Sequence, residues 1–145
     1  MEESRTLLPP TTLLSKAIRA GITLDGPQVR EQYFRIVYKY DEAKIAGCCA
    51  LGAALLAVCN VVPQPTFADK AEFIFPDGQS FVTARDAADH VWPPLKLNVP
   101  CPGFTEDDDA PCVERSNQTS IVIHLNDEHR WTREQIADWL EMQGL

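Results

Sequence analysis

The chain has 145 residues, of which 45% are hydrophobic and 23% charged, and its formal net charge is -8. These values are ordinary for a globular protein, and the length predicts a single domain over residues 1–145 with enough core to fold unaided. Residues 63–145 hold fifteen acidic and six basic side chains. Nucleic acid is therefore disfavoured as a ligand, since phosphate contacts need a basic face. The acidity instead serves solubility or meets a basic protein surface.

The N-terminal third predicts a short helix followed by a hairpin. Residues 1–10 are expected to form a flexible arm, and Thr12 is placed to cap a helix that ends at Gly21, as helices often do at glycine. Over residues 32–40, aromatic and β-branched side chains alternate with polar ones, which is typical of a strand with one buried face. A second strand over residues 44–47 would complete the hairpin.

A run of eighteen uncharged residues, 45–62, is long enough to raise the question of a membrane span. Its main residues are Ala, Gly and Cys, which insert weakly, and it contains Gly52 and Asn60 before stopping at Pro63. We therefore expect a buried helix over residues 49–59, with small side chains that let other elements approach closely, and no membrane span.

The middle of the chain predicts a second hairpin and a short helix. Strands are expected over residues 71–75 and 79–82, joined by the turn Pro76-Asp77-Gly78. Thr83 can then cap a helix over residues 84–91. His90 falls in the last turn of that helix, where an imidazole interacts favourably with the negative pole, so a structural role is favoured over catalysis.

The C-terminal third contains the clearest helix start in the sequence. Thr132 is followed three residues later by Gln135, which is the spacing of a capping box. Ile136, Trp139 and Leu140 then form an apolar stripe. A preceding helix over residues 118–125 would make a C-terminal helical hairpin. The expected fold class is α+β: small antiparallel hairpins, a buried small-residue helix and this helical hairpin.

The five cysteines lie at positions 48, 49, 59, 101 and 112. The chain begins Met-Glu-Glu, whereas a secretory signal begins with basic residues. A cytoplasmic location is therefore expected, in which cysteines are buried thiols or metal ligands before they are disulfides. For Cys48 and Cys49 the expected role is that of small buried hydrophobic groups.

Cys101 and Cys112, together with two of the three histidines, suggest a structural zinc site. Ten residues separate Cys101 from Cys112, eleven separate Cys112 from His124, and four separate His124 from His129. The last two spacings fit a Cys2His2 zinc site, whereas the first is usually two to four residues. A loop through residues 106–110 would account for the excess, at little cost in free energy. A metal-free packed core, or a disulfide in an exported protein, are the alternatives.

The last third of the chain also carries a motif of cysteine, histidine and tryptophan residues. Its residues are Cys101-Pro102, His124-Leu125-Asn126-Asp127, His129, Trp131 and Ile136-Ala137-x-Trp139. The motif resembles uncharacterised small proteins of bacteria and their phages. The resemblance implies a zinc-finger-like unit over residues 101–145 and a phage-associated context, and it supplies no mechanism.

These observations favour a non-enzymatic, protein-binding accessory or inhibitory factor with an acidic surface, monomeric or a small homo-oligomer. No residue is assigned a catalytic role. One alternative is a small enzyme that uses the Cys/His cluster as a metal hydrolase or thiol nucleophile. Another is a structural or assembly component. A closed four-ligand zinc leaves no position for water, whereas a catalytic zinc keeps one open.

Overall fold

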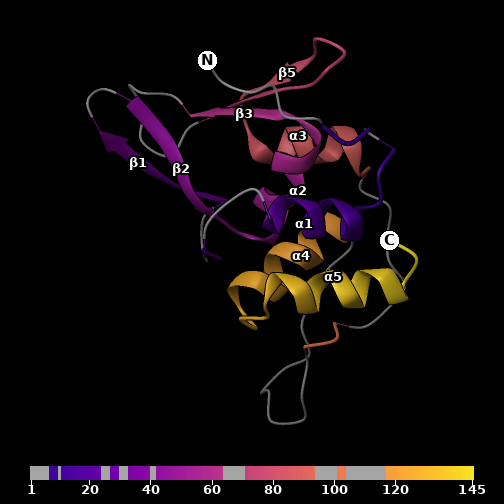
Figure 1. Cartoon of the computed structure of the whole chain (residues 1–145). Helices are drawn as coiled ribbons and strands as arrows, with labels where there is room; N and C mark the ends of the chain where they lie inside the picture. The colour runs from indigo at the N-terminus through magenta and orange to yellow at the C-terminus, as the bar shows by residue number, and fades with distance from the viewer. Residues whose placement is uncertain are drawn as a thin grey trace.

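The computed structural model describes residues 7–9, 11–23, 27–29, 33–39, 42–63, 71–93, 101–103 and 117–145. Within these ranges five helices accompany a two-stranded and a three-stranded antiparallel sheet, which confirms the α+β class. The helices are α1 (Leu14–Ile22), α2 (Ala50–Val58), α3 (Ala84–Val91), α4 (Gln118–Asp127) and α5 (Arg133–Met142). In Figure 1 the three-stranded sheet lies at the top and α5 at the bottom, with α1 and α2 between them.

Helix α2 is the centre of the core, because all nine of its residues are buried. This confirms the prediction of a buried helix rich in small residues. The helix begins after Cys49, whose Sγ accepts a hydrogen bond from the Gly52 N–H at 3.3 Å. Among the described residues, no helix is both long and apolar enough to cross a membrane.

Helix α1 packs along α2, and it differs from the prediction at both ends. It starts at Leu14 with Leu13 at the N-cap, which makes no side-chain capping bond, so the predicted capping role of Thr12 is wrong. It also continues past Gly21 to Ile22. A Cβ at Gly21 would overlap the backbone carbonyl of Ala53 in α2. The glycine therefore permits close helix packing instead of ending the helix.

The predicted N-terminal arm is partly fixed. The N–H of Leu8 donates to the carbonyl of Ala57 at 2.8 Å, and Leu8 packs against the core. Residues 1–6 and 10 lie outside the described residues, as do the predicted segments in 64–70, 94–100 and 104–116.

The first hairpin is confirmed. Its second strand extends at both ends beyond the predicted residues 44–47. Strand β1 (Phe34–Lys39) pairs antiparallel with β2 (Glu42–Cys48), and the register shifts between Arg35 and Ile36. In Figure 1 this hairpin projects from one side of the molecule. Phe34 is buried at its base, against Phe73 of the other sheet.

The second hairpin is confirmed as well, but it belongs to a three-stranded sheet. Strand β4 (Ala71–Ile74) pairs with β5 (Ser80–Phe81) across a turn in which Gly78 has a φ of 93°. On its other side β4 pairs with β3 (Asn60–Pro63), a strand that the sequence did not predict. Four residues after a helix give no periodic signal, and the pairing with β4 creates the strand.

Helix α3 starts as predicted, because Thr83 Oγ1 accepts a hydrogen bond from the Asp86 N–H at 3.2 Å. His90 lies in its last turn, with ring centroids 5.0 Å from Phe75 and 5.1 Å from Phe81. These aromatic contacts agree with the structural role expected for this histidine.

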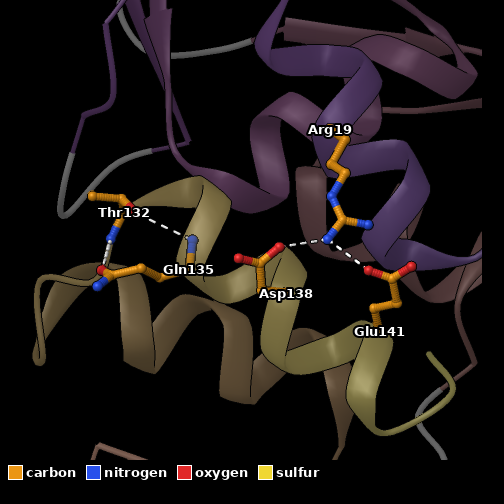
Figure 2. Close-up of polar contacts among 5 residues, drawn as sticks. All are labelled: Arg19, Thr132, Gln135, Asp138 and Glu141. Atoms are coloured by element: carbon orange, nitrogen blue, oxygen red, sulfur yellow. Dashed lines mark hydrogen bonds and ion pairs between the residues drawn. The ribbon is translucent and has the colours of Figure 1, made fainter.

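Helices α4 and α5 form the predicted C-terminal pair. The capping box is present: Thr132 Oγ1 accepts from the Gln135 N–H, and the Thr132 N–H donates to Gln135 Oε1 (Figure 2). Ile136 and Leu140 are fully buried, while Trp139 lies half-buried at the edge of the predicted stripe.

Arg19 of α1 reaches across to α5. Its Nη2 lies 2.6 Å from Asp138 and 2.8 Å from Glu141, as Figure 2 shows. The hydrogen bond to Asp138, and after it the hydrogen bond to Glu141, are the largest causes that raise the pKa of the Arg19 guanidinium above its ordinary value. The two carboxylates are mostly exposed and the Arg19 side chain is 37% exposed. Solvent therefore screens these ion pairs, and they add little to the free energy of unfolding.

Candidate metal centre

Three of the four predicted zinc ligands lie together in the structure. Cys101, His124 and His129 offer ligand atoms that are all within 4.8 Å of one another, and this group is able to hold a metal ion. Cys101 Sγ is 3.5 Å from His129 Nε2. The two imidazole rings meet edge to face, with centroids 4.7 Å apart. The fourth predicted ligand, Cys112, lies outside the described residues.

His124 is placed by the buried face of α4. His124 is only 5% exposed, and its Nδ1 lies 2.8 Å from the carboxylate of Glu128, one helical turn later. A carboxylate on the second ring nitrogen is the usual support for a metal-binding histidine, because it fixes the orientation and tautomer of the ring. Glu128 was not predicted as a supporting residue, although its spacing of four residues from His124 places it one helical turn away.

His129 is placed by the end of α4. Arg130 adopts a left-handed conformation with a φ of 56°, and the Trp131 N–H then reaches the Leu125 carbonyl at 2.9 Å. A left-handed residue other than glycine costs about 1–2 kcal/mol, so surrounding contacts must hold this turn. This turn after α4 keeps the His129 ring beside the ring of His124.

Gly103 brings the Cys101 segment close to His129. A Cβ at position 103 would lie 2.5 Å from the His129 ring, which is shorter than carbon contacts allow. Residues 102 and 103 form a turn, as predicted for the Cys-Pro-Gly sequence. The glycine of that turn therefore allows the loop to pack directly on the imidazole.

The other described cysteines play a different part. Cys48, Cys49 and Cys59 are all buried, and for Cys48 and Cys49 this agrees with the expected role of small hydrophobic groups. Burial raises the pKa of the Cys49 thiol to about 12, so this thiol stays protonated near neutral pH. The Cys59 thiol donates to the Leu55 carbonyl at 3.2 Å. A protonated, buried thiol is a poor metal ligand and a poor nucleophile.

Comparison with known proteins adds no family to these observations. The chain matches no protein-family model, no curated protein and no solved structure. The geometry of the Cys/His cluster and the charge of the surface therefore carry what can be inferred about function.

Proposed function

We propose that the chain is a non-enzymatic, protein-binding domain whose C-terminal third is stabilised by a structural zinc ion. Cys101, His124 and His129 are three of its ligands, and Cys112 is the fourth. Zinc bonds of about 2.3 Å to sulfur and about 2.0–2.1 Å to nitrogen place tetrahedral ligands S and N about 3.5 Å apart. Cys101 Sγ and His129 Nε2 are 3.5 Å apart, and this distance carries the proposal.

The proposed ion would join parts of the chain that are distant in sequence. It links the turn at Cys101 to α4 and to the residue two positions beyond the end of that helix. Glu128 faces Nδ1 of His124, which assigns Nε2 of that ring to the metal. With a second thiolate from Cys112 the coordination sphere is closed, so the ion is structural and no water is activated.

The surface charge supports a basic protein as the partner. Glu134, Asp138 and Glu141 are exposed on α5, and Arg19 neutralises part of this charge. Binding to a basic surface is expected to weaken as salt is added, because exposed charges are screened. Binding that is insensitive to salt would contradict this part of the proposal. The role of an accessory or inhibitory factor encoded by a phage rests on the resemblance of the C-terminal motif.

One observation favours a second candidate function, that of a metal hydrolase. His124 and Glu128 also line a surface pocket of about 210 Å³. If Cys112 is not a ligand, a metal held by the three clustered side chains keeps a position for water, as catalytic zinc does. The two candidates differ in their dependence on Cys112.

The zinc content of the purified protein is the decisive measurement. We expect about one zinc per chain, lost in both His129→Ala and Cys112→Ser, because a structural site needs all four ligands. Cys59→Ser removes a buried thiol outside the cluster and should retain the metal. Retention of zinc in Cys112→Ser, with loss in His129→Ala, would favour the hydrolase. A wild-type protein without metal would contradict both candidates.

Gly103→Ala tests the geometry without removing a ligand. The added Cβ would lie 2.5 Å from the His129 ring and should displace it from Cys101, so zinc affinity should fall by about tenfold or more. Competition with a chromogenic chelator measures this affinity. Ser80→Ala is the control, because Ser80 is exposed and lies outside the Cys/His cluster. Equal affinity in Gly103→Ala and wild type would show that His129 is not a ligand.

A further inference from the structure

A surface pocket of about 210 Å³ lies between α3 and α4, on the side of His124. Its lining combines a cation, a hydroxyl, an apolar side chain, an imidazole and a carboxylate: Arg85, Ser120, Ile123, His124 and Glu128. Sites for drug-sized ligands are about 300–1,000 Å³, so this pocket admits only a small molecule.

Arg85 and Ser120 make one part of the pocket suited to a carboxylate. Arg85 Nη2 donates to Ser120 Oγ at 3.3 Å, which holds the guanidinium of α3 beside the hydroxyl of α4. Because Ser120 Oγ accepts this bond, its own hydrogen is directed elsewhere and can be donated to a ligand. A guanidinium with further N–H groups and a hydroxyl donor are the groups that proteins use to bind carboxylates.

Glu128 makes another part suited to a cation. Its side chain is 64% exposed, and its Oε2 lies 2.8 Å from His124 Nδ1. A carboxylate has about four acceptor positions, so this contact is compatible with further hydrogen bonds from a ligand ammonium group. Ile123, which lies between the two groups in the sequence of α4, supplies an apolar wall.

We propose that this pocket binds a small zwitterion, with its carboxylate on Arg85 and Ser120 and its ammonium group on Glu128. The Glu128 carboxylate lies beside His124, which is four positions, or about 6 Å along the axis of α4, from Ser120. The ligand charges must therefore stand several bonds apart, as in a dipeptide, and not on neighbouring atoms as in an α-amino acid. The dipeptide class thus fits both the charges and the size of the pocket.

This binding site goes beyond the proposed zinc site, because Arg85 and Ser120 do not belong to the Cys/His cluster, and it adjoins that cluster at His124. Ligand binding and zinc content are separate measurements on the same purified protein. Failure of one proposal is therefore distinguishable from failure of the other.

Titration with glycylglycine, followed by backbone amide shifts in NMR spectra, tests the proposal. We expect saturable shifts at Ser120 and Ile123 with a dissociation constant on the order of 1–10 mM, typical of a few hydrogen bonds. Arg85→Gln should weaken binding by about tenfold or more, since it removes the charged donor. Ser120→Ala should weaken it several-fold. Arg19→Gln, which changes an exposed arginine on another helix, should leave binding unchanged.

Three results would overturn the proposal. One is the absence of shifts up to about 50 mM glycylglycine, a concentration well above the expected dissociation constant. Another is binding of acetate, methylammonium or glycine as tightly as glycylglycine, since these lack one charge or the required spacing. The third is wild-type affinity in a folded Arg85→Gln protein. If Arg85→Gln does not fold, the folded Ser120→Ala protein decides in the same way.

Discussion

Asn126→Ala is expected to lower the free energy of unfolding by about 3–5 kcal/mol, because it removes the centre of a buried hydrogen-bond network. Asn126 is fully buried. Its Oδ1 accepts from Gln28 Nε2 at 2.7 Å and from the Ala50 N–H at 3.1 Å. Its Nδ2 donates to the Val29 carbonyl at 2.9 Å and to Asp127 Oδ1 at 2.7 Å. All four hydrogen-bonding positions of this amide are therefore used.

The network joins segments that are distant in sequence, which explains the expected size of the effect. Gln28 Nε2 also donates to the Trp131 carbonyl at 2.8 Å, and Gln28 Oε1 accepts from the Arg133 N–H at 3.2 Å. Asn126 thus links the start of α2, the end of α4 and the start of α5. Alanine would remove the hydrogen bond to the Ala50 N–H and that to the Val29 carbonyl, and each buried group that loses its partner costs about 1–3 kcal/mol.

Thermal unfolding followed by circular dichroism measures the effect of Asn126→Ala. The midpoint should fall by about 6–20 °C, given about 2–4 °C per kcal/mol for a chain of this size. Asn60→Ala is the matched control, since Asn60 is exposed on β3 and its loss should change the midpoint little. A midpoint for Asn126→Ala within a few degrees of wild type would show that the network does not hold these helices together.

Gly21→Ala is expected to have the second large effect, a loss of about 3 kcal/mol or more in the free energy of unfolding. The new Cβ would overlap the Ala53 carbonyl oxygen, which belongs to the backbone of α2 and cannot rotate away. Helices α1 and α2 would have to separate. Leu14 and Ile18 of α1 are fully buried in the core, so separation also opens a gap around them.

Denaturant unfolding of Gly21→Ala provides the measurement. Alanine has the higher helix propensity by about 1 kcal/mol, so a helix that merely tolerated glycine would gain stability from the change. The sign of the effect therefore separates close packing from a simple helix end. Lys16→Ala, at an exposed position of the same helix, controls for propensity and should be close to neutral. A more stable Gly21→Ala protein would contradict the close approach of α1 to α2.

Several features encoded by neighbouring residues were predicted correctly from the sequence, whereas the Thr12 cap was not. The Thr132 and Gln135 capping box, the Thr83 cap and the turn at Gly78 each depend on side chains within a few positions of one another. The uncharged small residues of α2 also identified the buried helix. Local hydrogen bonds and backbone preferences fix such features in nearly any tertiary context.

The candidate site was predicted in part. The histidine spacing and the Cys-Pro-Gly turn indicated Cys101, His124 and His129, and the structure brings all three together. The ligand role of Cys112 stays a prediction. The supporting contacts of Glu128 and Gly103 were not predicted, because spacing alone does not show which groups surround a ring.

By itself, then, the sequence determined the local elements and the residue types able to bind metal. Only the tertiary structure explains the glycine at position 21, the burial of Asn126 and the extended conformation of β3. Each of these depends on contacts with another segment of the chain: α2, residues 27–29 or β4. Hydrophobic periodicity records which face of an element is buried, whereas the identity of the atoms that meet it is set only when the elements pack.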